Sequence, residues 1–183
     1  MVALEDLIKR CAGNSICIVE GFKARLDSGY SPDQDEVRYV SSLIGEPAKR
    51  VEVFSGRYID VFTRLLEKKC YYSGDRALCI YSWNPRMPVR YFPVSLDATG
   101  TILLIEGSEV SPVAYPTHRA HDIEGRGVEL LDPEKAGIAE VTARVDGYHI
   151  TFYYNPLLGR WVPATRYALH NMRYVGKRAV VGT

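Results

Sequence analysis

The spacing of apolar residues changes part-way along the chain, and this change limits the fold more than any other sequence feature. Before residue 74 the apolar residues recur mainly at helical spacing. From Ala77 onward, short runs rich in β-branched and aromatic residues alternate with turn-forming residues, as they do in strands. The pattern predicts an α+β fold with a helical region at 1–74 and an antiparallel or mixed sheet at 75–183. The alternative is that both regions pack as one compact unit.

The helical region is expected to hold three helices. The apolar residues within 4–8 indicate a short helix at the N-terminus. Asp33 followed by Glu36 is typical of a helix start, and Gly45 is typical of a helix end. Residues 51–68 keep apolar side chains on one helical face and arginines largely off it, which predicts a third and longer helix.

Six runs in the second region predict strands, and Asn155 to Gly159 predicts the turn of a hairpin. The runs are ALCIYSW at 77–83, VRYFPVSL at 89–96, TILLIEG at 101–107, EVTARV at 140–145, YHITFYY at 148–154 and RWVPATR at 160–166. The aromatic residues of the last two runs alternate, so we assign them to the core and to cross-strand pairs rather than to a base-stacking surface. They are Tyr148, Phe152, Tyr153, Tyr154 and Trp161.

The overall charge excludes a strong general attraction to nucleic acid. The chain has 183 residues and a formal net charge of +1, so contact with RNA would need a local patch. No run of about 18 apolar residues is present, and the acidic, amphipathic N-terminus differs from a signal peptide. We therefore expect a cytoplasmic protein without a membrane span. Arginine outnumbers lysine and there is a single glutamine, a bias found in some thermophile families.

The cysteines and histidines do not form a metal-binding pattern. Cys11, Cys17, Cys70 and Cys79 have no C-x-x-C spacing, and the cytosol disfavours disulfides, so we expect four buried thiols. No cysteine or carboxylate completes a zinc set with the histidines at familiar spacing. The sequence predicts no metal site of this kind.

Two segments carry a more specific pattern. The first is Tyr115-Pro116-Thr117-His118-Arg119; the second contains Arg144-Val145-Asp146-Gly147-Tyr148, the hairpin turn and Ala164-Thr165-Arg166-Tyr167. In order and spacing they resemble the adenylylation domain of ATP-dependent RNA ligases, particularly the archaeal type. The resemblance covers about the last half of the chain. It implies part of a ligase-type nucleotidyltransferase sheet, with ATP and Mg²⁺ as cofactors if nucleotide binding is retained.

The resemblance also assigns roles to residues. Arg144 stands where the family has the lysine that attacks ATP, Asp146 and Gly147 form the turn that fixes this position, and Arg166 would reach the nucleotide. His118 and Arg119 are the candidate RNA contacts. An arginine stays protonated in proteins and is a poor nucleophile. Tyr167 replaces a family glycine, and the family's later motifs are expected to be missing after Thr183.

Three functions remain open. The first is a degenerate RNA ligase relative that binds RNA or nucleotide without self-adenylylation. The second is a ligase fragment that works only with a partner chain supplying the later motifs. The third is a scaffold for protein–protein contacts or a homo-oligomer, because an incomplete sheet exposes edges that can pair. The site residues also have simpler explanations. Asp146-Gly147 could be an ordinary turn, and His118 and Arg119 could be part of an exposed loop. Arg144 could be a solvated residue or an ion-pair partner, and Arg166 could pair with Asp146.

The arginine at position 144 leads to a direct chemical prediction. Incubation with radiolabelled ATP and Mg²⁺ is expected to give no protein–AMP adduct, because a guanidinium stays protonated and is a poor nucleophile for the α-phosphate. Labelled protein on a denaturing gel is the measurement. A covalent adduct on any side chain would contradict the interpretation.

Overall fold

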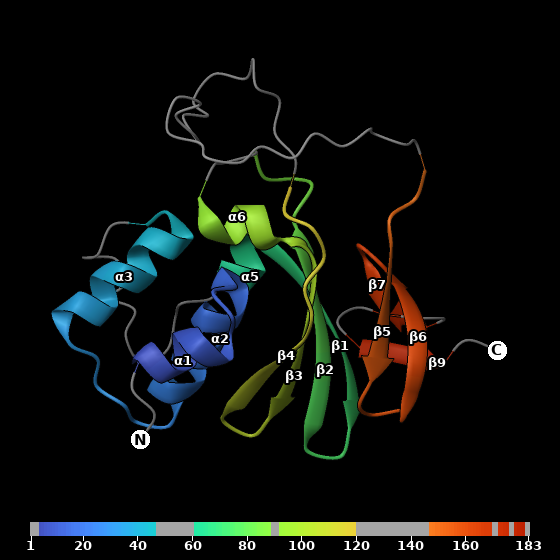
Figure 1. The fold of residues 1–183 in the computed structure, drawn as a ribbon, viewed down its shortest axis with the longest axis horizontal. Coiled ribbons are helices and arrows are strands. Elements are labelled where there is room, and N and C mark those ends of the chain that lie inside the picture. Colours follow the sequence, from blue (N-terminus) through green and yellow to red (C-terminus); the bar gives the residue numbers. More distant parts are fainter. Residues whose placement is uncertain are drawn as a thin grey trace, which may run out of the picture.

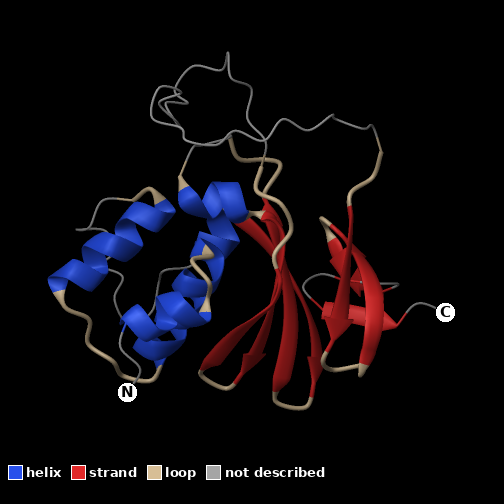
Figure 2. Ribbon diagram, in the orientation of Figure 1, coloured by secondary structure: helices blue, strands red, loops and turns tan. Residues whose placement is uncertain are grey.

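The computed structural model describes residues 4–46, 61–88, 92–119, 147–169, 172–175 and 178–181. These residues form an α+β fold in three layers. Helices cover one face of a six-stranded sheet, and a three-stranded sheet covers its other face (Figures 1 and 2). The predicted fold class is confirmed.

The helices lie early in the chain, with one exception. They are α1 (Leu4–Arg10), α2 (Ser15–Asp27), α3 (Gln34–Ile44), α5 (Val61–Arg64) and α6 (Pro93–Asp97). The strands are β1 (Leu66–Ser73), β2 (Arg76–Trp83), β3 (Thr99–Glu106), β4 (Glu109–Ala114), β5 (Ile150–Asn155), β6 (Arg160–Thr165), β7 (Ala168–Leu169), β8 (Met172–Val175) and β9 (Arg178–Val181).

The large sheet is built mainly from consecutive antiparallel strands. Its order is β4-β3-β2-β1-β9-β8, and only β1 and β9 pair in parallel. The small sheet has the order β5-β6-β7 and is antiparallel throughout. The position considered for a region boundary, Ser73-Gly74, lies at the tight connection between β1 and β2, so both sides of it belong to the same sheet.

Side-chain caps explain where two of the helices begin. The Asn14 side chain accepts a hydrogen bond from the Cys17 backbone N–H at 3.1 Å and starts α2. Asp33 and Glu36 form the capping box that the sequence predicts, and they start α3. Gly45 ends α3 in the left-handed conformation that favours glycine (φ 65°).

Two predicted elements are wrong where the structure describes them. Of the long helix expected over 51–68, the described part holds only α5, which ends at Arg64. Strand β1 begins at Leu66, because it pairs along its whole length with β2. Residues 51–60 lie outside the described residues. The strand expected over 89–96 is instead the short helix α6, which has Pro93 in its first turn, where proline is tolerated.

Strand β2 joins the two halves of the core. Its residues alternate between the two faces of the sheet, and Cys79, Tyr81 and Trp83 face the helices. Leu78 and Ile80 face the small sheet, where they pack with Tyr153, Val162, Ala164 and Leu169. A nearly continuous apolar run is typical of a strand covered on both sides. The helices therefore share one core with the large sheet.

The four cysteines are buried, as predicted, but the expectation of free thiols is wrong. Cys70 lies directly opposite Cys79 in the register of β1 and β2, with 4.1 Å between their Cα atoms, and the two form a disulfide. Cys11 and Cys17 form the second disulfide across the turn between α1 and α2. Spacing along the chain does not show this pairing, because the strand register brings the first pair together.

No helix within the described residues is both long and apolar enough to cross a membrane.

The disulfides predict a stability that depends on reductant. Breaking each bridge is expected to lower the free energy of unfolding by about 2 to 3 kcal/mol, because each bridge closes a short loop in the unfolded chain. Thermal unfolding with and without dithiothreitol measures the effect. The variant with all four cysteines changed to alanine is the control, and its Tm should not respond to reductant. Four titratable thiols in the denatured, unreduced wild type would contradict the pairing.

Candidate nucleic-acid interface

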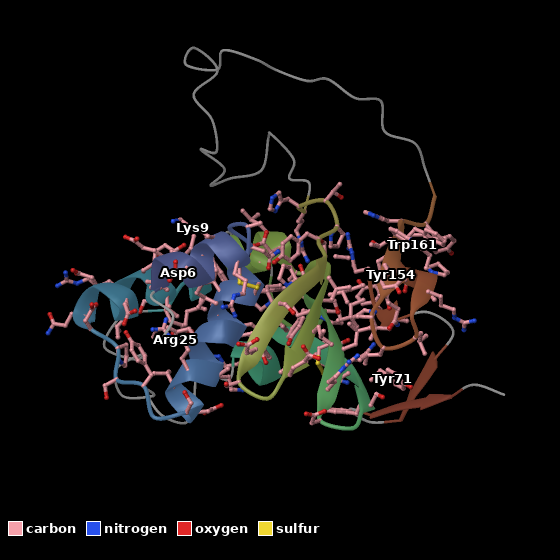
Figure 3. The ribbon with its side chains drawn as sticks, turned by 60° about the horizontal axis from the view of Figure 1, so that its bottom comes forward. Asp6, Lys9, Arg25, Tyr71, Tyr154 and Trp161 are labelled. Atoms are coloured by element: carbon pink, nitrogen blue, oxygen red, sulfur yellow. A yellow bond between two sulfur atoms is a disulfide. The ribbon has the colours of Figure 1, made fainter. Side chains whose placement is uncertain are left out.

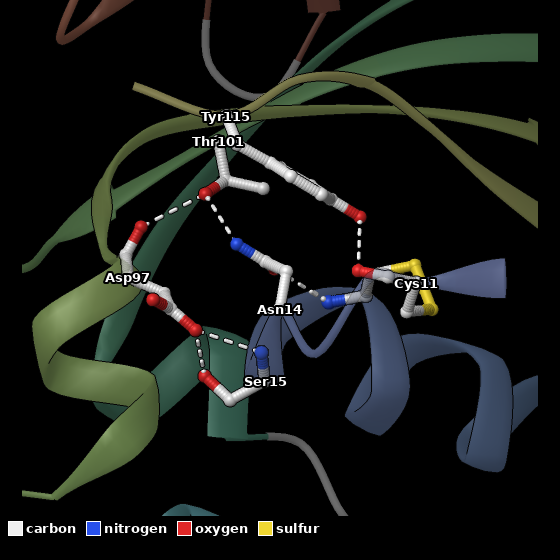
Figure 4. The surroundings of a disulfide bond; sticks show 7 residues. Cys11, Asn14, Ser15, Asp97, Thr101 and Tyr115 are labelled. Atoms are coloured by element: carbon white, nitrogen blue, oxygen red, sulfur yellow. Dashed lines mark hydrogen bonds between the residues drawn. A yellow bond between two sulfur atoms is a disulfide. The ribbon is translucent and has the colours of Figure 1, made fainter. Parts of the chain in front are cut away.

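A buried carboxylate organises the end of α6 and the start of β3. Asp97 Oδ2 accepts hydrogen bonds from the Ser15 backbone N–H at 2.7 Å and from the Ser15 hydroxyl (Figure 4). Asp97 Oδ1 lies 2.8 Å from His118 Nδ1. We call Ser15, Asp97 and His118 the strand-end cluster. A carboxylate at the first turn of α2 is also favoured by the helix dipole.

Further hydrogen bonds tie the same elements together. The Thr101 hydroxyl donates to the Asp97 carbonyl at 2.8 Å and accepts from the Asn14 amide at 3.4 Å. The Tyr115 hydroxyl donates to the Cys11 carbonyl at 2.9 Å, beside the first disulfide (Figure 4). Burial, with a contribution from the Asp97 charge, raises the pKa of Tyr115, so this phenol remains a hydrogen-bond donor.

The two candidate RNA contacts of the sequence have partners within the chain. The His118 side chain is 78% exposed but is held by Asp97. The Arg119 backbone N–H donates to the Leu96 carbonyl at 3.0 Å, and its guanidinium lies 5.9 Å from the centre of the Trp83 ring. Arg119 therefore packs on the core, and His118 remains accessible.

The structure brings the segments of His118 and Arg166 to the same end of β3. The Thr99 hydroxyl donates to the Thr117 carbonyl at 2.8 Å. The next residue, Gly100, has φ 109°, and a Cβ atom there would lie 3.1 Å from the Arg166 Cα. Any larger residue would push away the turn that carries Arg166, so glycine permits this close approach. Arg166 itself is exposed.

The remaining candidate residues are only partly described. Gly147 is exposed, has φ 156° and immediately precedes the fully exposed Tyr148. Arg144 and Asp146, the predicted nucleophile position and its neighbour, lie outside the described residues. The strand expected over 140–145 lies outside them too.

The hairpin of β5 and β6 carries aromatic side chains on both of its faces. Tyr153, Val162 and Ala164 point into the core, as predicted for Tyr153. The predicted cross-strand pairing is confirmed for Trp161 with Tyr154 and Phe152. The prediction that these residues and Tyr148 belong to the core is wrong: Tyr148 is 98% exposed, Phe152 64%, Tyr154 49% and Trp161 61%. Residues of opposite parity in a strand face opposite ways, and only one set can reach the large sheet.

The exposed aromatic side chains form an ordered group. Trp161 lies directly opposite Tyr154 and diagonally opposite Phe152 in the strand register. The rings of Phe152 and Trp161 are nearly parallel, at 8°, with centres 5.8 Å apart, and Tyr154 meets Trp161 edge-on at 6.0 Å. Figure 3 shows Tyr154 and Trp161 on this hairpin. With Ile150, which is 59% exposed, these three residues make up what we call the outer hairpin face.

The tip of the hairpin is fixed. The Asn155 side chain is buried and accepts hydrogen bonds from the backbone N–H groups of Leu157 and Leu158 at 2.9 and 3.1 Å. Arg76 on β2 donates to the Pro156 carbonyl at 3.3 Å. These contacts hold the hairpin against the large sheet, so the outer hairpin face is presented by a rigid element.

Charge is distributed unevenly along the chain. From Gly147 to Thr183 there are five basic residues and no acidic residue, although the whole chain has a net charge of only +1. Four arginines elsewhere pair with carboxylates: Arg25 with Glu36, Arg38 with Asp35, Arg64 with Glu46 and Arg76 with Glu106. No carboxylate within the described ranges forms an ion pair with Arg160 or Arg166. The absence of acidic residues after Asp146 is a sequence signal that predicts this patch, and Arg160 belongs to it.

A separate cavity of about 390 Å³ lies between α2 and the large sheet. Glu20 on its wall is paired with Lys68, and the Lys68 ammonium lies over the rings of Phe62 and Tyr81. Burial raises the pKa of Tyr81 well above its usual value, and the Glu20 charge adds to the shift. This phenol therefore stays protonated. The described residues contain no group of three side chains arranged to hold a metal ion.

Comparison with known proteins gives no match: no family model, curated protein or solved structure is similar to the chain.

The strand-end cluster predicts unequal effects of two substitutions. Asp97→Ala is expected to cost about 3 kcal/mol of stability, because it leaves the buried N–H and hydroxyl of Ser15 without their acceptor. His118→Ala is expected to cost less than about 1 kcal/mol, since its side chain is mostly exposed. Urea unfolding of both variants measures the difference. Equal costs would show that Asp97 does not organise this end of the sheet.

Proposed function

We propose that the chain binds RNA without forming a protein–AMP intermediate. The observation that supports this most strongly is the basic, acid-free region from Gly147 onward, which places the exposed Arg160 and Arg166 at opposite ends of β6. Arginines that pair with no carboxylate of the described residues suit contact with phosphate groups, because a guanidinium can bind two phosphate oxygens at once. Such contacts need no reaction of the protein.

The resemblance to RNA ligases fits this proposal. In that family the segments of His118 and Arg166 belong to the nucleotide and RNA site, and in this chain both segments meet at the start of β3. His118 is accessible for a phosphate contact, while Arg119 supports the segment from Trp83. Arg144 in place of the lysine removes the self-adenylylation step. If the chain binds ATP with Mg²⁺, it then does so without reacting with it.

Two other functions compete with this one. A ligase fragment completed by a partner chain would still lack the nucleophilic lysine. A protein-binding scaffold or a homo-oligomer is favoured by the exposed apolar side chains of the outer hairpin face. Charge favours RNA, because a general protein partner does not require a segment without acidic residues, as found from Gly147 onward.

A cytoplasmic location is part of the proposal. Two buried disulfides are unusual in the cytosol of mesophiles, but intracellular proteins of hyperthermophilic archaea and bacteria often contain them. The excess of arginine over lysine, found in some thermophile families, agrees with a thermophilic source, and the resemblance to archaeal RNA ligases agrees with an archaeal one.

Salt dependence tests the phosphate contacts. The ligand is a short single-stranded RNA carrying a 5′-phosphate. The slope of log affinity against log salt concentration is expected to become shallower by about 0.7 in Arg166→Ala, and by the same amount in Arg160→Ala. Fluorescence anisotropy of a labelled oligonucleotide measures the affinity.

Arg38→Ala is the matched control. It removes the same charge from an exposed arginine of α3, at the opposite end of the molecule (Figure 1). The control should leave the slope unchanged. Binding that is absent in the wild type, or insensitive to salt, would contradict the proposed function.

A further inference from the structure

The outer hairpin face has aromatic side chains that the fold does not need. The core side of the same two strands is already filled by Tyr153, Val162 and Ala164. The opposite side holds Phe152, Tyr154 and Trp161 in contact with one another and about half exposed or more. Single exposed apolar residues need no explanation, but a contiguous group on a rigid element marks an interaction surface.

The charges around this surface select its partner. Arg160 precedes Trp161 in β6, and Arg166 follows the other end of the strand, roughly 20 Å away at about 3.3 Å per residue. No acidic residue occurs between Gly147 and Thr183. Arg160 and Arg166 have the parity of Val162 and Ala164, so these exposed arginines border the outer hairpin face at its two ends and do not lie on it. Aromatic rings bordered by cations suit a chain of flat bases joined by phosphates. A purely apolar protein partner would offer no negative charge to either arginine.

We propose that the outer hairpin face is a stacking platform for the unpaired bases of single-stranded RNA. The inference rests on the proposed RNA binding and adds to it how the strand is recognised. Bases stack on Trp161, Phe152 and Tyr154, while Arg160 and Arg166 contact the phosphates on either side. Stacking on aromatic rings tolerates any base, so the platform distinguishes single strands from duplexes and not one sequence from another.

The experiment compares three ligands of equal length: a single-stranded RNA, an oligonucleotide with abasic positions that keeps the phosphates, and a blunt RNA duplex. The wild type is expected to bind the single strand more tightly than either of the other two. Trp161→Ala is expected to weaken single-strand binding roughly 5- to 150-fold, with less effect on the abasic ligand. Trp161→Phe keeps a ring at this position and should recover much of the affinity.

The control is Tyr72→Ala, which removes an aromatic side chain that is 58% exposed on β1, outside the hairpin. It should bind all three ligands as the wild type does. Circular dichroism and Tm confirm that each variant is folded, which is expected because Trp161 points away from the core.

The outcomes separate the two proposals. If the wild type binds the single strand and the abasic ligand equally, and Trp161→Ala changes neither, stacking is overturned while phosphate binding stands. If no ligand binds, both proposals fail. If sedimentation shows a dimer that Trp161→Ala dissociates, and this variant still binds RNA normally, the outer hairpin face is an interface between two copies of the chain and stacking is overturned.

Discussion

Burial of strand β2 on both faces is the constraint on which the other elements depend. Its side chains alternate between a core shared with the helices and a core shared with the small sheet. Each cover is needed because the run from Ala77 to Trp83 would otherwise expose apolar residues to water. The β5–β6 hairpin provides one of these covers, and its inner residues are committed to that contact. The outer residues of the hairpin are then free to serve binding.

The strand-end cluster has a different role. Asp97 links the first turn of α2, the end of α6 and the segment of His118 through one buried carboxylate. Gly100, three residues further on, admits the turn that carries Arg166. Residues that are far apart in the sequence therefore meet at one end of β3. This arrangement positions the candidate contacts, whereas the arginines of β6 and its following turn supply the charge.

The sequence predicts the elements whose signals are local. The capping box of Asp33 and Glu36 predicts α3, and the apolar alternation of four runs predicts β2, β3, β5 and β6. Prediction fails where tertiary pairing decides the outcome. Residues 66–68 have a spacing compatible with a helix, but pairing with β2 makes them a strand. Strand register also brings Cys70 and Cys79 together, which no spacing rule along the chain indicates.

The candidate site was predictable only in part. Alternation shows that Tyr153 and Tyr154 face opposite ways, but it does not show which of them meets the large sheet, so the exposed aromatic group could not be assigned from sequence alone. The sequence singles out the segments of His118 and Arg166 separately, and the structure places both of them at the start of β3. The resemblance does not point to Arg160; the absence of acidic residues after Asp146 is the sequence signal that predicts the basic patch to which it belongs.

The central claim is that this chain holds single-stranded RNA on the β5–β6 hairpin. Ultraviolet cross-linking of the wild-type protein to a uridine-rich RNA, followed by mass spectrometry of the digested peptides, tests it most directly. The account predicts nucleotide adducts on peptides from Gly147 to Leu169, centred on Phe152, Tyr154 and Trp161. Adducts confined to the helices α1 to α3, with none on the hairpin, would contradict it.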